Sequence, residues 1–366
     1  MKCTIERGSL LKVLQRVQGI VEKRNTMPIL SNVFLEARSG GAEITATDLE
    51  IFLRDTCEAS VAEEGKITVN ARKMFEIVKE LTDDDVNISV SDGGRIDIQG
   101  GNALFKIVGL PVDEFPSFPV IDETPLTRIA PEELHDMVEK TYFAASTDET
   151  RYNINGVFLE RVDNTLKMTA TDGHRLALIE KRSEELSSLS GGVILPRKGV
   201  AELRKLFEEK EGTFQIGFTK TYCIVRKDNT VLVVRLIDGD FPDYRQVLPE
   251  GNDKTLIADR RALLSSLKRV SILSSERVKG VRFSLTSGTL ELSSSSPEIG
   301  EAKEALAVDY EGDEVAIGFN ARYVMDVLEV IDTEKVLFKL KGQLESGVIT
   351  PVENDGYVYV IMPMRI

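Results

Sequence analysis

An internal repeat limits the possible folds of this chain more than any other property of its sequence. The tetrapeptide TATD stands at residues 45–48 and again at 169–172, and VFLE precedes both copies. A weaker third copy, VKGVRFSLTSGTLEL, begins at Val278. The segments that precede the three copies are also alike, since each is a short β-branched run followed by a helical pattern. Such self-similarity indicates one structural unit that is repeated three times, with a period of about 120 residues.

Each unit is itself built from two similar halves. The second halves read KITVNARKMFEIVKEL, GVILPRKGVAELRKLFEEK and EVAIGFNARYVMDVLEVI, and each is again a strand followed by a helix. Segments such as EITATDLEIFL alternate with a period of two, as antiparallel strands do. Six strand-helix-strands modules predict an α+β protein, with one helix layered on several strands in each half. Modules that repeat with a regular rotation form a curved array, and such an array is able to close into a ring.

Turn-rich segments divide the chain into three predicted domains. PSFPVIDETPL and LPEGNDK are the candidate linkers. The predicted domains are residues 1–120, 127–249 and 253–366. Helices are expected over residues 9–17, 71–80, 131–141, 197–210, 259–270 and 321–331.

The apolar residues of two predicted helices follow the same spacing. The stripe expected to face the core consists of Leu10, Leu11, Leu14 and Val17 in the first helix. In the fifth helix it consists of Leu263, Leu264, Leu267 and Val270.

The charge is divided unevenly along the chain. The whole chain has a net charge of -14, which taken alone points away from nucleic acid. The six predicted helices, however, carry +4, which leaves -18 for the rest. Basic helices on an acidic body would hold a polyanion by its phosphates without reading sequence. Lysine and arginine also suit helices for their propensity and solubility, so the charge pattern alone leaves both interpretations open.

The composition is that of a folded protein outside the membrane. Apolar residues make up 42% and charged residues 29% of the chain, and the mean hydropathy is -0.11. No apolar run approaches the roughly 20 residues of a membrane-spanning helix. Glu6, Arg7 and Lys12 interrupt the stretch where a signal peptide needs an apolar core, so we expect a cytoplasmic location. The three widely spaced cysteines form neither a disulfide framework nor a metal-binding motif, and we expect free thiols.

The segment MTATDGHRLAL (residues 168–178) has the residue types of an acid-base site. A hydrolase that uses Asp172 and His174 would need a nucleophile or a second acid within reach. The repeat argues against catalysis, because Asp48 occupies the matching place in the first copy, where no histidine follows. The chain also contains no nucleophile elbow, P-loop, zincin or dinucleotide motif. The part special to the second copy is GHRL, and the residues alone leave open whether it is a binding patch or a structural turn.

The C-terminal sequence VYVIMPMRI is apolar almost to the last residue, whereas termini are usually polar and frayed. It predicts a final strand that ends before Pro363, because proline cannot continue a central strand. The two methionines that flank this proline, Met362 and Met364, are typical of an adaptable surface that partner peptides use.

With these motifs, the chain resembles the bacterial DNA polymerase III beta subunits, the replicative sliding clamps, along its whole length. The most specific segments are TATDGHRLAL (169–178), ILPRKGV (194–200), DGDFPDYRQVLP (238–249) and YVIMPMRI (359–366). The resemblance implies the DNA-clamp fold: a head-to-tail homodimeric ring, with helices lining the hole, sheets outside and double-stranded DNA passing through. It implies a processivity factor that performs no chemistry and needs no cofactor or metal.

The implied partners are the DNA polymerase III alpha subunit, an ATP-dependent clamp loader, and other polymerases and repair proteins that dock through short linear motifs, with no role for a membrane. A clamp-like ring without a replicative role stays open as an alternative.

The resemblance also implies site residues. The DNA contacts would be Arg24, Arg72, Tyr152, Asn153 and Lys198. The pocket for partner peptides would consist of Ile154, Thr171, Gly173, His174, Arg175, Leu176, Pro242, Val247, Leu344, Ser346, Val360, Met362, Pro363, Met364 and Arg365. The dimer interface would include Ile272 and Leu273, with acidic residues near Glu298, Glu301 and Glu304. Gln246 and Asn153 depart from some relatives, which have an arginine at the pocket rim and a tyrosine at the DNA-facing loop.

Overall fold

The computed structural model describes residues 1–21, 27–91, 94–121, 124–183, 186, 189, 191–275, 279–353 and 356–365. The chain divides into two compact units. The first unit contains residues 1–131, 185–188 and 201–236, and the second contains residues 132–184, 189–200 and 237–366. The middle repeat is therefore shared between the two units, its first half in the second unit and most of its second half in the first.

The first unit contains two antiparallel sheets, with the strand orders β5-β1-β7-β8-β9 and β10-β15-β16-β17-β4-β3-β2-β6. The five-stranded sheet consists of β1 (Lys2–Glu6), β5 (Ala59–Glu63), β7 (Asp85–Ser91), β8 (Arg95–Gly100) and β9 (Ala103–Val108). The eight-stranded sheet consists of β2 (Asn32–Arg38), β3 (Gly41–Thr47), β4 (Ile51–Cys57), β6 (Gly65–Asn70), β10 (Thr127–Ile129), β15 (Phe214–Phe218), β16 (Tyr222–Lys227) and β17 (Thr230–Arg235). Strand β17 pairs with β4, so this sheet joins strands of the first and middle repeats.

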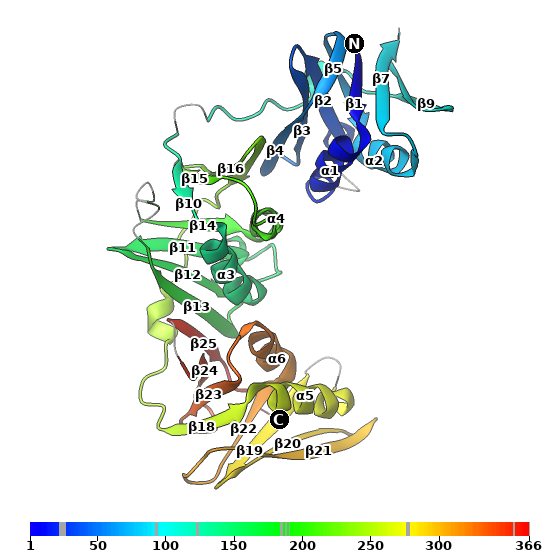
Figure 1. Ribbon diagram of the computed structural model, residues 1–366. Coiled ribbons are helices and arrows are strands. Elements are labelled where there is room, and N and C mark those ends of the chain that lie inside the picture. Colours follow the sequence, from blue (N-terminus) through cyan, green and yellow to red (C-terminus); the bar gives the residue numbers. More distant parts are fainter. Residues whose placement is uncertain are drawn as a thin grey trace. The chain divides into compact units, whose positions relative to one another are not determined.

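The second unit also contains two antiparallel sheets, ordered β14-β11-β12-β13-β25-β24-β23-β18 and β21-β20-β19-β22. The larger sheet consists of β11 (Gly156–Val162), β12 (Thr165–Thr171), β13 (Arg175–Arg182), β14 (Gly192–Pro196), β18 (Lys254–Asp259), β23 (Lys335–Leu340), β24 (Gly347–Pro351) and β25 (Tyr357–Ile361). The smaller sheet consists of β19 (Gly280–Thr286), β20 (Thr289–Ser296), β21 (Gly300–Ala307) and β22 (Val315–Asn320). Figure 1 shows the last strand, β25, lying beside β13, so the middle and third repeats also share a sheet.

The helices begin where strands end. They are α1 (Arg7–Val17), α2 (Ala71–Glu80), α3 (Pro131–Thr141), α4 (Arg197–Glu208), α5 (Arg260–Val270) and α6 (Ala321–Val330). For α1, α2, α5 and α6, the last residue of the preceding strand is the N-cap, and its side chain accepts backbone N–H groups of the first turn. A polar residue at this position stabilises a helix by roughly 1 kcal/mol, so the same residue ends the strand and starts the helix. Helix α4 ends two residues earlier than the sequence predicts.

Helices α1 and α2 pack together in the first unit, and α5 and α6 pack together in the second (Figure 1). The buried face of α1 consists of Leu10, Val13, Leu14 and Val17, and that of α5 consists of Leu263, Ser266, Leu267 and Val270. The expected Leu11 and Leu264 are only half-buried. At about 100° per residue, position 13 lies closer to the centre of the stripe than position 11 does, and the same holds for positions 266 and 264. Each predicted stripe was therefore wrong at one residue. The first includes Leu11 in place of Val13, and the second includes Leu264 in place of Ser266.

Two further expectations concern the state of the cysteines and the presence of a membrane-spanning helix. Cys3, Cys57 and Cys223 are buried and free, so the predicted free thiols are confirmed. Within the described residues, no helix is both long enough and apolar enough to cross a membrane.

Candidate functional site

The two TATD segments form the same tight turn. In the second copy, Oδ1 of Asp172 accepts the backbone N–H groups of His174 and Arg175 at 2.9 and 3.1 Å. In the first copy, Oδ1 of Asp48 accepts the N–H groups two and three residues further on, at 3.0 and 2.7 Å. The aspartate common to both copies therefore serves the fold, as the repeat predicts, by satisfying backbone donors where one strand turns into the next.

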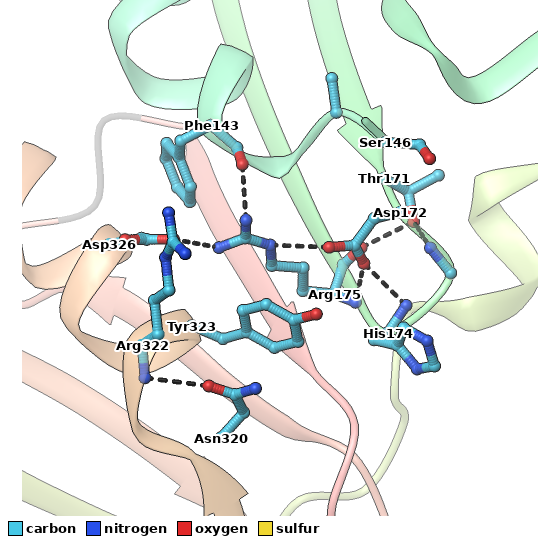
Figure 2. Close-up of polar contacts among 12 residues, drawn as sticks. Phe143, Ser146, Thr171, Asp172, His174, Arg175, Asn320, Arg322, Tyr323 and Asp326 are labelled. Atoms are coloured by element: carbon cyan, nitrogen blue, oxygen red, sulfur yellow. Dashed lines mark hydrogen bonds and ion pairs between the residues drawn. The ribbon is translucent and has the colours of Figure 1, made fainter. Parts of the chain in front are cut away.

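The turn in the second copy does not form an acid-base pair. The second carboxylate oxygen of Asp172 accepts Nε of Arg175 at 3.0 Å. His174 is exposed, and its backbone rather than its imidazole bonds to Asp172. Figure 2 shows this arrangement, in which the carboxylate is surrounded by N–H donors. A carboxylate used in this way fixes the turn and does not activate a histidine.

The turn borders an apolar hollow of about 200 Å³ in the second unit. The lining residues are Arg151, Ile154, Thr171, Gly173, Arg175, Leu176, Pro242, Asp243, Tyr244, Val247, Ser346, Val360 and Met362. They come from the segment 151–154, the β12–β13 turn with its flanking strand ends, the segment 242–247, the residue before β24, and the end of β25 with the residue that follows it. Pockets of this kind, apolar with a few polar groups at the rim, bind apolar side chains of a ligand or peptide.

A small hydrophobic cluster forms the floor of this hollow. Leu176, Tyr244 and Val360 are buried against one another. Phe158 and Phe241 pack on them, with their rings stacked at 4.9 Å between centroids. The segment 242–247 is thus attached to the sheet through side chains, which explains how a stretch rich in turn residues keeps a defined shape.

A charged hydrogen-bond network supports the same segment. The hydroxyl of Tyr244 donates to Oε1 of Glu160 at 2.6 Å, and Arg245 donates to the same carboxylate at 2.9 Å. Burial and the bond to this carboxylate raise the pKa of Tyr244, so the phenol stays protonated and remains a donor. Gln246 donates to Asp243 at 3.1 Å, so the residue that departs from some relatives has a partner within its own loop.

The C-terminal segment forms a further wall. Strand β25 ends at Ile361, two residues before Pro363, as the sequence predicts. Beyond it, the N–H of Met362 donates to the carbonyl of His174 at 2.9 Å, and the N–H of Met364 donates to the carbonyl of Gly318 at 2.8 Å. These alternate bonds hold the segment between the two sheets of the unit.

The structure brings ten of the fifteen predicted pocket residues together around the hollow. His174, Leu344, Pro363, Met364 and Arg365 do not line it. Leu344, Met364 and Arg365 instead line a second hollow of about 190 Å³ with Arg282 and Gln343.

Three lining residues were missing from the prediction. Asp243 and Tyr244 lie within DGDFPDYRQVLP, which the sequence marks as distinctive, so a signal for them existed. Arg151 had none. It reaches the site by donating to the carbonyl of Asp172 at 2.9 Å, a contact between segments 21 residues apart.

The residues predicted to contact DNA lie on different elements of the fold. Arg24 is outside the described residues. Arg72 lies in the first turn of α2 and pairs with Glu76 at 2.9 Å, and Lys198 lies in the first turn of α4. Tyr152 is 58% exposed, and the neighbouring Asn153 donates to the carbonyl of Asp240 at 3.4 Å.

The residues predicted at the dimer interface lie on the short helix Ser271–Leu273. Ile272 is 72% exposed, which is unusual for an isoleucine, and Leu273 is half-buried. Glu304 is engaged within its own chain, because Arg269 donates to its two oxygens at 2.9 and 2.5 Å.

Comparison with known proteins gives a consistent result along the whole chain. Residues 1–119, 128–243 and 245–365 match the N-terminal, central and C-terminal domains of the DNA polymerase III beta subunit. The chain is 39% identical over 370 residues to the beta sliding clamp of Pseudomonas putida, with 100% of both sequences covered. It matches the solved DNA polymerase III subunit beta from Pseudomonas aeruginosa with a TM-score of 0.94 at 38% identity, again over 100% of both chains. A sliding clamp from the same organism bound to griselimycin matches with a TM-score of 0.93 at 38% identity and the same coverage.

Proposed function

Since the chain belongs to the DNA polymerase III beta subunit family and acts as a sliding clamp, we propose that two copies close into a ring around duplex DNA. A clamp of this family is a processivity factor and carries out no chemical step itself. The ring slides because its phosphate contacts do not depend on sequence. It keeps a bound polymerase at a high effective concentration near the primer, which is a topological and not a catalytic contribution.

The apolar hollow beside the β12–β13 turn is the proposed docking site for the polymerase. The observation that supports it best is its construction: an apolar lining closed on one side by a C-terminal segment that two backbone hydrogen bonds hold in place. Short linear motifs with apolar anchors bind such grooves, and side chains such as Met362 adapt to different partners. We propose that the replicative polymerase, the clamp loader and repair proteins compete for this site. Griselimycin, which is bound in the Pseudomonas aeruginosa clamp, is proposed as a small-molecule probe of it.

Two uncovered sheet edges are the proposed dimer contacts. Among the described residues, isolated bridges to neighbouring segments cover the edge strands β6, β14, β18 and β22. The edge strands β5, β9, β10 and β21 have no such cover, and β9 and β21 are the longest of them; an open edge is a template for pairing with another chain. Strand β9 also exposes apolar side chains, with Leu104 52% and Val108 72% exposed. We propose that β9 of one copy pairs with β21 of the other, next to Ile272 and Leu273.

The DNA contacts are proposed to be those that the family resemblance implies, Arg24, Arg72, Tyr152, Asn153 and Lys198. Arg72 and Lys198 each lie in the first turn of a helix, where a flexible cationic side chain reaches a phosphate without fixing its register. An ATP-dependent loader is proposed to open the ring, in the cytoplasm. Because these contacts are electrostatic and non-specific, their loss would weaken binding to all duplex sequences alike.

Removal of residues 362–366 tests the docking site. The deletion removes one wall of the hollow and both backbone bonds of the C-terminal segment, but no residue of β9 or β21. We expect a protein that is still a dimer but no longer stimulates primer extension by the polymerase. Deletion variants that retain full stimulation would contradict the docking site and leave the clamp fold untouched.

A further inference from the structure

The two copies of the TATD turn differ in one buried side chain. Both aspartates cap their turns in the same way, and the residue after each has a positive φ, +79° at Leu49 and +90° at Gly173. The position of Arg175 is taken by Ile51 in the first copy. The first turn therefore forms without an arginine, and Arg175 must have a different task from that of shaping the turn.

Every nitrogen of the Arg175 guanidinium has an acceptor on a different element. Nε donates to Asp172 at 3.0 Å, one terminal nitrogen donates to Asp326 of α6 at 2.5 Å, and the other donates to the carbonyl of Phe143 at 2.6 Å. Figure 2 shows the side chain extended between the turn and α6, with the ring of Tyr323 beside it. The guanidinium carbon lies 4.2 Å from the centroid of this ring.

Arg175 is too fully engaged to act as a free handle for a ligand. The residue is only 9% exposed, although it borders the hollow. A buried charge is tolerated when its hydrogen bonds are satisfied, and breaking one partner of such a group is strongly unfavourable. The three acceptors thus fix the guanidinium, and through it they fix the turn relative to α6.

The turn that Arg175 holds also binds the C-terminal segment, which forms another wall of the hollow. Between Asp172 and Arg175 lies His174, whose carbonyl accepts the N–H of Met362. Gly173 and Leu176, on either side, line the hollow. Asp326 does not line it. A change at Asp326 would therefore act on the ligand indirectly, and its direct link to the lining is the bond to Arg175.

We propose that Asp326 is a positioning residue for the peptide pocket: it anchors Arg175, and Arg175 aligns the turn with the C-terminal segment so that the pocket is formed before a partner arrives. The proposal rests on the docking site proposed above. It gives Arg175, which the family resemblance places in the pocket, a role in which its charge is used within the protein. Preorganisation of this kind raises affinity by removing the cost of ordering the site on binding.

The substitution Asp326→Asn tests the proposal, because it keeps the size of the side chain and removes the charge that holds Arg175. We expect griselimycin, titrated by calorimetry, to bind about 2- to 30-fold more weakly, the range for substitutions that act on a site without touching its ligand. Glu329→Gln is the matched control. It removes one carboxylate from the same helix, where Glu329 pairs with Lys268 at 2.8 Å and both side chains are more than half exposed. This control should bind griselimycin with unchanged affinity.

A double-variant cycle separates positioning from simple destabilisation. If Asp326 acts through Arg175, Asp326→Asn should cost nothing more in an Arg175→Ala background, because coupled residues are not additive. Additive losses, or a lower unfolding temperature of Asp326→Asn with wild-type affinity, would overturn the proposal. Failure of the docking site itself has a different signature, since griselimycin would then bind equally well to the wild type and to the chain lacking residues 362–366.

Discussion

At the scale of single residues, the turn at 172–175 shows what a repeated sequence can and cannot predict. The structural role of its aspartate was predictable, because the same residue recurs where no histidine follows. The task of Arg175 was not, because its acceptors on α6 and on Phe143 lie 151 and 32 residues away in the chain. The neighbour Arg151 was missed for the same reason. Side chains that bridge distant segments leave no periodic signal.

Gly173 offers a test of this turn. Its φ of +90° is a conformation that L residues adopt at a cost of about 1–2 kcal/mol, and a Cβ there would lie 2.8 Å from the Arg151 guanidinium. We expect Gly173→Ala to lower the unfolding temperature and also to weaken griselimycin binding, because Arg151 must move out of its place in the hollow. Gly191→Ala is the control, since Gly191 has a φ of +84° and a Cβ added there would meet no atom within 4 Å. For the control, calorimetry should show a lower unfolding temperature and unchanged griselimycin binding. Equal losses of binding in both variants would contradict the role of Arg151.

At the scale of elements, the sequence predicted the helices well and their faces less well. All six helix windows agree with the structure to within two residues at both ends, since a strand-to-helix step with a capping residue is a strong local signal. The buried faces were misplaced at Leu11 and Leu264, because a run of two leucines does not say which of them lies nearer the core. The pairing of β17 with β4 had no sequence signal at all, since strand alternation does not name a partner.

An ion-pair network joins elements of the first unit and makes a prediction about acid. Arg16 of α1 donates to Glu209 at 2.7 and 3.0 Å and to Asp55 of β4 at 2.6 Å, and Lys227 of β16 also bonds to Glu209. Burial opposes the charge on Glu209, but Arg16 and Lys227 together outweigh it and lower its pKa from 4.5 to about 2. The folded state therefore binds this proton less readily than the unfolded state, so the stabilisation is complete above about pH 4.5 and is lost as the pH falls towards 2.

Glu209→Gln should flatten this part of the pH profile. Urea unfolding followed by circular dichroism is expected to show a smaller loss of stability between pH 4.5 and pH 2 for the variant than for the wild type. Glu208→Gln, at a neighbouring side chain that is 53% exposed, should follow the wild type. Parallel curves for Glu209→Gln and the wild type would mean that solvent screens the network and that it adds no stability.

At the scale of the whole molecule, the three repeats and the two compact units describe different properties of one chain. The repeats reflect local pattern, which a sequence displays. The units reflect which strands share a sheet, and both large sheets combine strands of two repeats. The sequence therefore predicted the number of modules, while the continuity of the sheets across repeat boundaries had to come from the structure. The two smaller sheets each contain strands of one repeat only, and their edges β9 and β21 are the longest that no bridge covers, which connects the fold to assembly.

Exposure of Ile272 leads to the last prediction, which concerns assembly. An isoleucine that is 72% exposed gains from burial against a second copy, whereas an aspartate there would have to be desolvated on association. For a chain of 40.6 kDa, light scattering should give twice that mass for the wild type at micromolar concentration and the single mass for Ile272→Asp.

Val120→Asp, at an apolar side chain that is 90% exposed and lies outside β9, β21 and the helix Ser271–Leu273, should remain a dimer. Loss of the dimer in Ile272→Asp should also abolish retention on circular nicked DNA, because only a closed ring is held topologically, while griselimycin affinity should be unchanged. A dimeric Ile272→Asp variant would place the contact elsewhere. A dimer lost in both variants would show that added negative charge, and not the position, prevents association.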